Sequence, residues 1–371
     1  MRRASRVCAG AGAAAVLLLT ASSARSDDPV TSAVRFNREI VRIFDRKCVS
    51  CHSPAGIAMS LATYRDVRPW ARAIREEIVE QRMPPTSAVR GFSRLKDDIA
   101  LTPRELSTIL TWVDGGVPRG DESDLPAAHS TPAAAEPDVR LALPPQQIPG
   151  DGQDLVRQLT VATGLAEGRW LRQVRIRPGN SRLLRAAFVS ILREGQPPVW
   201  AGSWTPWQTD VSPAPPGAWL LRRGSRLSIE LHYRGQDAAT VDSSEIGLFF
   251  APEGEWRDLT SIVLTPATPN GHREHHASPV RAETTLEHDS VVWGGRIEVA
   301  ADGSSVEVAA RRPDGSIDVL LWVPKLNAVW PAPFIFMDPV ALPAGTVISA
   351  TNAGGTAAVR PRIILTLHPA S

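Results

Sequence analysis

Cys48-Val49-Ser50-Cys51-His52 is the stretch of sequence on which the interpretation of the whole chain depends. Two residues separate the cysteines, and a histidine follows the second one directly. On one helical turn, both sulfurs can reach the two vinyl groups of a haem, while the histidine can bind the iron as its proximal ligand. This spacing is typical of c-type haem attachment. We therefore expect one covalent haem c, held by Cys48 and Cys51 and ligated by His52.

Other interpretations of the cysteine pair are open. A redox-active disulfide usually lies in a thioredoxin-like βαβ unit, and no such pattern surrounds the pair. A zinc site needs a second pair of ligands, and none follows nearby. A chance match is the remaining alternative in a chain that contains three cysteines.

The first residues of the chain agree with the haem motif. Three arginines precede an apolar stretch at residues 7–19, and small residues follow it. This pattern predicts a secretory signal peptide over residues 1–26, so we expect a periplasmic or secreted protein. Cys8 would leave with the signal, so the mature chain has no disulfide framework. No later run approaches the roughly 20 apolar residues of a membrane helix, so we expect no transmembrane anchor.

Composition and length set two further limits. The chain has 41 Lys and Arg against 39 Asp and Glu, a formal net charge of +2. We therefore expect neither nucleic acid nor an anionic membrane as a partner. A length of 371 residues exceeds what one core usually supports, which predicts two or three domains.

Residues 32–125 carry helical patterns around the haem motif. Phe36, Ile40 and Phe44 recur at helical spacing just before it. Further on, Thr102-Pro103-Arg104-Glu105 is a capping box with proline at the first helical position, which predicts the start of another helix. These patterns predict a small all-α class I-type cytochrome c domain over residues 32–125.

The sixth iron ligand is expected to be a methionine, because residues 32–125 contain no histidine besides His52. Met59 follows His52 too closely to reach the opposite face of a haem. Met83 lies much further on, in a loop stiffened by Pro84 and Pro85, and is the expected distal ligand. The alternative role for either methionine is core packing. Thioether ligation raises the haem potential and blocks the iron, which favours electron transfer over oxygen chemistry.

The pattern changes from helical to alternating after a linker. Residues 126–137 are rich in alanine and proline, which predicts that linker. In residues 227–233, Leu, Ile, Leu and Tyr alternate with Ser228, Glu230 and His232, as in a strand with one buried face. Similar segments and intervening turns continue through the β region, residues 138–371. We predict two antiparallel β-sandwich domains there, over residues 138–260 and 261–371.

Several longer motifs carry a family resemblance. They are Met59-Ser60-Leu61, Arg68-Pro69-Trp70-Ala71-Arg72-Ala73-Ile74, Arg82-Met83-Pro84-Pro85 and Trp112-Val113-Asp114-Gly115-Gly116, then Arg177-Pro178-Gly179-Asn180, Leu231-His232-Tyr233, Pro313-Asp314-Gly315, Val323-Pro324 and Leu342-Pro343-Ala344-Gly345-Thr346. With them, the chain resembles bacterial cytochrome c domains fused ahead of a copper type II, ascorbate-dependent monooxygenase-like region. The β region is similar to peptidylglycine hydroxylating monooxygenase, which implies two jelly-roll domains that each bind one copper.

Most copper ligands implied by this resemblance are missing. The family's His-Tyr strand is matched by His232 and Tyr233, so His232 is the only remaining family ligand. Arg185-Ala186 stands where a His-His pair is implied, and Val292-Trp293-Gly294-Gly295 where a His-x-His is implied. The closing residues 362–371 contain no methionine. A lone imidazole holds copper weakly, so we expect no copper.

The remaining histidines have two interpretations. On the polar side of its strand, His232 is expected to be hydrogen-bonded or partly exposed. His272, His275, His276 and His288 lie in or near an expected loop outside the implied ligand positions, and we expect them to be solvated. A genuine metal site among them is the alternative.

The sequence therefore predicts an exported mono-haem c-type cytochrome that transfers electrons to a periplasmic redox partner protein. The β region is then a degenerate copper-monooxygenase-like module for docking or binding. One alternative is a copper-dependent monooxygenase that receives electrons from its own haem c. Another is a β region that binds a ligand or cell-wall component, for which Trp200, Trp204 and Trp207 are candidate groove residues.

Overall fold

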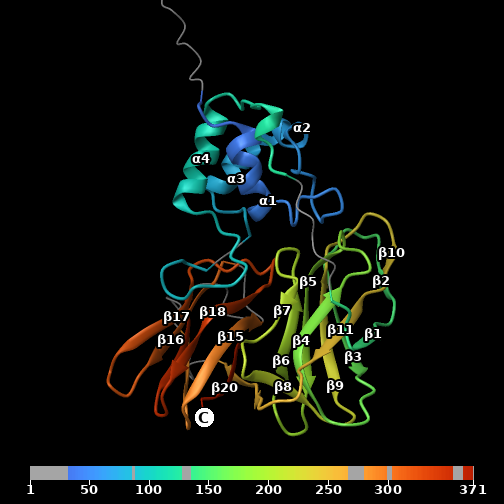
Figure 1. Cartoon of the computed structure of the whole chain (residues 1–371), viewed down its shortest axis with the longest axis vertical. Coiled ribbons are helices and arrows are strands. Elements are labelled where there is room, and N and C mark those ends of the chain that lie inside the picture. Colours follow the sequence, from blue (N-terminus) through green and yellow to red (C-terminus); the bar gives the residue numbers. More distant parts are fainter. Residues whose placement is uncertain are drawn as a thin grey trace, which may run out of the picture.

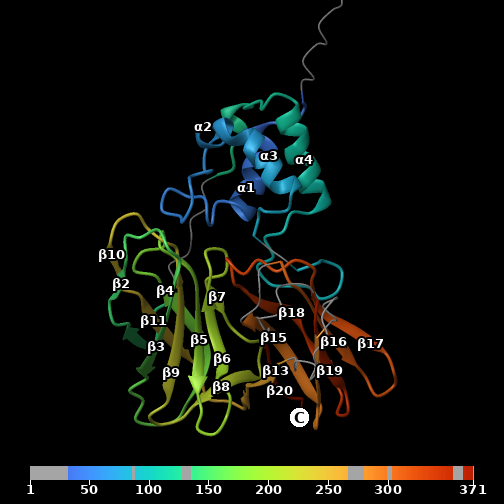
Figure 2. The ribbon, with the colours of Figure 1, turned by 180° about the vertical axis from the view of Figure 1, so that it is seen from behind.

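The computed structural model describes residues 32–85, 88–127, 135–265, 280–298, 303–353 and 362–370. A helical part, residues 32–125, stands above two groups of strands that lie side by side (Figure 1, Figure 2). The signal peptide expected over residues 1–26 lies outside the described residues, as does most of the expected linker. The expected domain boundaries themselves stay predictions.

The fold class expected from the sequence is wrong. In the described residues the chain is mostly β, with 41% strand and 14% helix, and no small all-α cytochrome c domain is evident. The β-sandwich content agrees with the expectation. The physical reason is that part of the expected domain belongs to the β region: Leu95 forms a bridge with Phe336, and the Val89 amide donates to the Trp322 carbonyl at 2.8 Å.

The helices are short. They are η1 (Phe36–Ile40), α1 (Val41–Lys47), α2 (Tyr64–Val67), η2 (Arg68–Trp70), α3 (Ala71–Val79), α4 (Pro103–Asp114) and η3 (Glu122–Asp124). The predicted capping box is confirmed: Thr102 accepts from the Glu105 amide, and the Glu105 carboxylate accepts from the Thr102 amide. Phe36, Phe44 and Trp112 are buried at the centre of these helices. The predicted spacing of Phe36, Ile40 and Phe44 therefore does form one buried face, which packs with Trp112 of α4.

Twenty strands make up the described β region. They are β1 (Val139–Ala142), β2 (Gln146–Ile148), β3 (Leu155–Ala162), β4 (Arg169–Arg177), β5 (Leu184–Leu192), β6 (Val199–Trp204), β7 (Asp210–Val211), β8 (Gly217–Leu221), β9 (Arg226–Tyr233), β10 (Thr240–Asp242), β11 (Glu245–Phe250), β12 (Arg257–Asp258), β13 (Thr260–Leu264), β14 (Val280–Thr285), β15 (Ser290–Glu298), β16 (Ser305–Arg311), β17 (Ile317–Val323), β18 (Pro333–Leu342), β19 (Val347–Ala353) and β20 (Arg362–Pro369).

The strands pair into two sandwiches. In the first, the order β1-β11-β4-β8-β12, with β7 beside β4, faces the order β3-β9-β5-β6, and a small β10-β2 sheet lies at one side. In the second, β13-β20-β15-β18 faces β14-β19-β16-β17. The predicted alternation in β9 is confirmed, because Leu227, Ile229 and Leu231 are fully buried while their neighbours are partly exposed. Such alternation is what a sheet with one core-facing side imposes.

The two sandwiches meet around buried tryptophans. The rings of Trp200 on β6 and Trp293 on β15 stack with centroids 5.1 Å apart, and Trp219 meets Trp293 edge-on at 5.6 Å. Apolar contact of this kind fixes how the sandwiches sit against each other. No helix in the described ranges is long and apolar enough to cross a membrane.

Candidate functional site

The cysteine motif lies in the wall of an apolar cavity. The motif follows α1 directly, and the His52 amide donates to the Cys48 carbonyl at 2.9 Å, so the chain keeps a turn there. Cys48, Cys51, His52 and both methionines of the helical part line this cavity. The rest of its lining comes from Phe44, Lys47, Ala58, Leu61, Ala73, Ile74, Glu77, Ile78, Pro84, Pro85, Ile99, Leu101, Ile109 and Trp330. The structure thus brings together every residue that the sequence assigned to the haem.

Both cysteines are free thiols in a dry environment. Burial raises the pKa of Cys48 to about 12, and the neighbouring Cys51 adds to the effect. Burial also raises the pKa of Cys51 to about 11. Both thiols are therefore protonated at neutral pH, unlike the low-pKa thiol of a disulfide-exchange centre. The raised pKa values therefore argue against a disulfide-exchange centre.

His52 has the hydrogen bonding of a metal-ligating histidine. Its Nδ1 lies 2.9 Å from the Met59 carbonyl oxygen, so Nδ1–H donates to that oxygen. The pKa of the ring is lowered by burial, and this hydrogen bond opposes the effect. A neutral imidazole held through Nδ1 leaves the Nε2 lone pair for a metal. The donor set and the apolar lining fit a haem.

The two candidate methionines differ in their backbone setting. Met59 is 43% exposed, and its carbonyl is the group that holds the His52 ring. Met83 follows the end of α3, where its amide donates to the Glu77 carbonyl at 3.2 Å. Both side chains line the cavity. The Met59 backbone is therefore hydrogen-bonded to His52, whereas Met83 reaches the cavity from the segment after α3.

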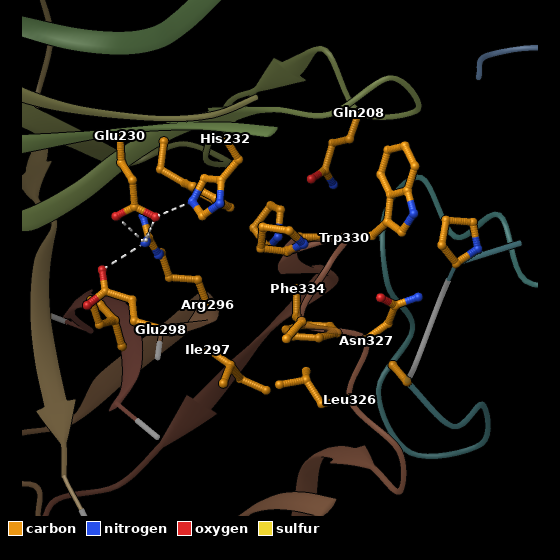
Figure 3. Close-up of a pocket in the computed structure, with 18 of the residues that line it drawn as sticks. Gln208, Glu230, His232, Arg296, Ile297, Glu298, Leu326, Asn327, Trp330 and Phe334 are labelled. Atoms are coloured by element: carbon orange, nitrogen blue, oxygen red, sulfur yellow. Dashed lines mark hydrogen bonds and ion pairs between the residues drawn. The ribbon is translucent and has the colours of Figure 1, made fainter. Parts of the chain in front are cut away.

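A second cavity, of about 580 Å³, lies between the two sandwiches and a segment of the helical part (Figure 3). Charged side chains gather at one side of it, on β9, β15 and β20. Aromatic and aliphatic side chains, among them Trp330, Phe334 and Leu326, lie across from them. Its volume is in the range of small-molecule sites. We call it the inter-sandwich cavity.

His232 belongs to an ion-pair cluster in this cavity. Its Nε2 lies 2.5 Å from Glu230 Oε1, and Arg296 Nη2 lies 3.1 Å from Glu230 Oε2. Arg296 also pairs with Glu298 at 2.9 Å, and Glu298 pairs with Arg362 at 3.1 Å. Burial disfavours the Glu230 charge, but the hydrogen bond from His232 and the charge of Arg296 outweigh this and lower its pKa to about 2. The four charges of Glu230, Arg296, Glu298 and Arg362 therefore compensate one another.

Arg185 lies on β5, next to Ala186. Ala186 pairs with His232 in the strand register. The Arg185 guanidinium forms an ion pair with Asp154 and lies 5.5 Å from the centroid of the Trp330 ring. A guanidinium at this position would repel a cation nearby.

Of the other four histidines considered as metal ligands, only His288 belongs to the described residues, and it lines neither cavity. His288 is exposed in the bend before β15. His272, His275 and His276 lie outside the described residues. Within the part of the chain that the structure describes, no three His, Cys, Asp or Glu side chains group as for a metal ion. The expectation of a copper-free β region stays a prediction.

Trp330 is the residue that sequence analysis missed. It lies in the segment before β18 and lines both cavities, as do Pro85 and Ile99. Its ring also meets Trp207, with centroids 6.1 Å apart. An isolated tryptophan in a loop has no periodicity, so its position could only be found from tertiary structure. Sequence analysis also missed Arg296 and Glu298, whose only local signal is that they flank Ile297 at the end of β15.

Comparison with known proteins gives little. No protein-family model matches the chain, and no curated protein matches it. The major capsid protein P2 of bacteriophage PM2 is similar over 63% of this chain and 98% of its own, with 10% identity and a TM-score of 0.29. The PBSX exported protein XepA is similar over 64% and 89%, with 11% identity and a TM-score of 0.18. Similarity this slight carries no argument about function.

Proposed function

We propose that this protein is a c-type haem protein that carries single electrons outside the cytoplasm, in the periplasm or after secretion. The observation that carries the proposal is the meeting of Cys48, Cys51, His52 and Met83 at one apolar cavity. Thioether bonds to the two sulfurs would hold the haem, and the bound haem supplies one-electron exchange. The likeness of the motifs to bacterial cytochromes fused to monooxygenase-like regions agrees with this role.

The chain's own residues prepare the cavity for such a group. The Met59 carbonyl holds the His52 ring through Nδ1, which keeps Nε2 unprotonated and oriented. Aliphatic and aromatic side chains such as Phe44, Ile74 and Trp330 keep water from the cavity. A dry lining with a thioether ligand favours the reduced, less charged state and so raises the reduction potential.

Met83 is the distal ligand in this proposal. The Met59 backbone carbonyl accepts from His52, so Met59 is committed to orienting the proximal histidine. Met83 comes from the segment after α3 and approaches independently. With His52 and Met83 both bound, the iron has no open position for a substrate, which suits electron transfer.

The β region serves as a copper-free docking or binding module in this proposal. His232, the one family ligand kept, donates its Nε2–H to Glu230 Oε1 at 2.5 Å and is thereby engaged. Arg296 lies within the same cluster, only 4% exposed. A cation already present beside the histidine disfavours a second one. The redox partner is then a protein that meets the haem edge.

Haem attachment is tested by mass spectrometry of the protein made in a host that matures c-type cytochromes. The chain should carry the mass of one haem, which survives acid–acetone extraction. Cys48→Ala with Cys51→Ala should abolish the added mass. Haem that extracts freely from the unaltered protein would overturn the proposal.

The carrier role is tested separately with carbon monoxide. A six-coordinate ferrous haem does not bind this ligand readily, so its Soret spectrum should not change on addition. Rapid carbon monoxide binding at neutral pH would mean an open iron position and favour ligand or oxygen chemistry instead.

A further inference from the structure

The inter-sandwich cavity has the features of a built binding site. Its volume of about 580 Å³ suits a small organic molecule. It is lined by strands of both sandwiches, β5, β9, β15 and β20, so rigid elements hold its side chains. Nothing in electron transfer by the haem requires this cavity.

The charges around the cavity balance. Three successive ion pairs of 2.9 to 3.1 Å link Glu230 to Arg296, Arg296 to Glu298, and Glu298 to Arg362. Asp98 is paired with Arg90 at 2.6 Å. Lys96 and Asp97 are opposite charges adjacent in the chain, and both line the cavity. A charged ligand would have to break one of these pairs, so an uncharged ligand is favoured.

His232 offers a hydrogen-bonding atom to a ligand, whereas Gln208 Oε1 and Arg296 Nε, which also lack a partner among the described residues, are buried. Glu230 engages His232 through Nε2, and the other ring nitrogen, Nδ1, is turned toward the cavity in Figure 3. Among the described residues, Nδ1 has no hydrogen-bond partner. When Nε2–H donates to Glu230, Nδ1 carries the lone pair and accepts a hydrogen bond. A hydroxyl group is the simplest uncharged donor for that nitrogen.

The opposite wall favours a ring. Trp330 and Phe334 face the polar cluster across the cavity, with Leu326 beside them (Figure 3). The Trp330 ring contacts Trp207, which also lines the cavity, and the Arg185 guanidinium, so it is fixed in place. A fixed indole face binds the face of another ring well, either an aromatic one or the C–H side of a sugar.

We propose that the inter-sandwich cavity binds an uncharged ring compound that carries a hydroxyl group, with the hydroxyl on His232 Nδ1 and the ring against Trp330. Phenols and monosaccharides share this chemistry. The inference does not depend on haem attachment, since no cysteine lines this cavity. Loss of haem binding would overturn the proposed function and leave the inference intact.

Isothermal titration calorimetry of the full chain with phenol, and separately with methyl glucopyranoside, tests the inference. At least one probe should bind at a single site. Anisole, which has phenol's ring without the O–H donor, should bind at least tenfold more weakly if phenol is the better probe. If only one probe saturates the site, the ligand belongs to the class of that probe, a phenol or a monosaccharide.

Variants locate the binding. His232→Leu and Trp330→Leu should each weaken the bound probe at least tenfold, while Trp256→Phe, outside the cavity, should leave it unchanged. Circular dichroism of each variant checks that the fold is retained. If one of the two variants unfolds, the binding measured with the other still tests the inference. Failure of both probes to bind, or binding that both cavity variants leave unchanged, would overturn the inference.

Discussion

Trp330 of the β region and Met83 of the helical part line the same apolar cavity, although they belong to different structural units. The segment 88–98 ties these units together, through amide donors at Val89 and Lys96 that each meet a β-region carbonyl at 2.8 Å. The wall of this apolar cavity, the proposed haem site, is therefore completed by the β region. A helical part cut out alone would leave that wall open to water.

Met83→Ala should remove the weak near-infrared band that marks sulfur-to-iron bonding in the oxidised protein, and lower the reduction potential. The reason is the loss of the thioether that favours the reduced iron. Met59→Ala should keep the band, because Met59 follows His52 by only seven residues and is 43% exposed, so it is not the proposed ligand. The opposite pattern, measured by absorption spectroscopy and redox titration, would assign the ligand to Met59.

Trp330→Ala should also lower the reduction potential, with the near-infrared band retained. Removing the indole opens the cavity wall to water, and a wetter haem stabilises the more charged oxidised state. The comparison is Trp256→Ala, whose indole donates to the Pro252 carbonyl at 2.9 Å, far from the cavity lining. Equal potentials for these two variants would show that Trp330 does not shield the haem.

Glu230→Gln should lower the free energy of unfolding at neutral pH by about 3 kcal/mol, the equivalent of the lowered carboxyl pKa. The folded pKa, about 2, lies below the ordinary value of 4.5. The stabilisation is therefore complete above that ordinary value and is lost as the pH falls toward the folded pKa. Urea unfolding at several pH values should show the difference shrinking below about pH 4.

If the difference in unfolding free energy between the unaltered protein and Glu230→Gln stayed constant from neutral pH to about pH 2, the loss of stability would not come from the Glu230 charge. Glu253→Gln is the control, since Glu253 is exposed in the turn after β11 and should leave the unfolding curves unchanged.

Copper titration of the full chain should give only weak binding that a competing chelator removes. His232 is engaged by Glu230, and Arg296 supplies a positive charge in the same cluster. Metal analysis of the purified protein should find iron equimolar with the chain and no copper. Copper retained in stoichiometric amount through a chelating column would instead support an oxygenase that draws electrons from the haem.

Local signals in the sequence determined the start of α4 and carry the prediction of the haem motif. Cys48, Cys51 and His52 lie within one turn, so their spacing alone fixes how they can meet a porphyrin. The Thr102–Glu105 capping box likewise depends only on residues three apart. The alternation through His232 predicted a strand with a polar face, and β9 has that face.

Tertiary structure alone decided the fold class and the inter-sandwich cavity. The segment 88–98 has no strand pattern, yet its amides need partners and find them on the β region, which is why an all-α domain was a wrong prediction. The same holds for Arg296, whose buried charge pairs with Glu298 two residues along β15 but also requires Glu230, 66 residues away in the chain. Periodicity reports which face of an element is buried. It does not report which distant group satisfies a buried donor or charge, because that depends on how the folded elements pack.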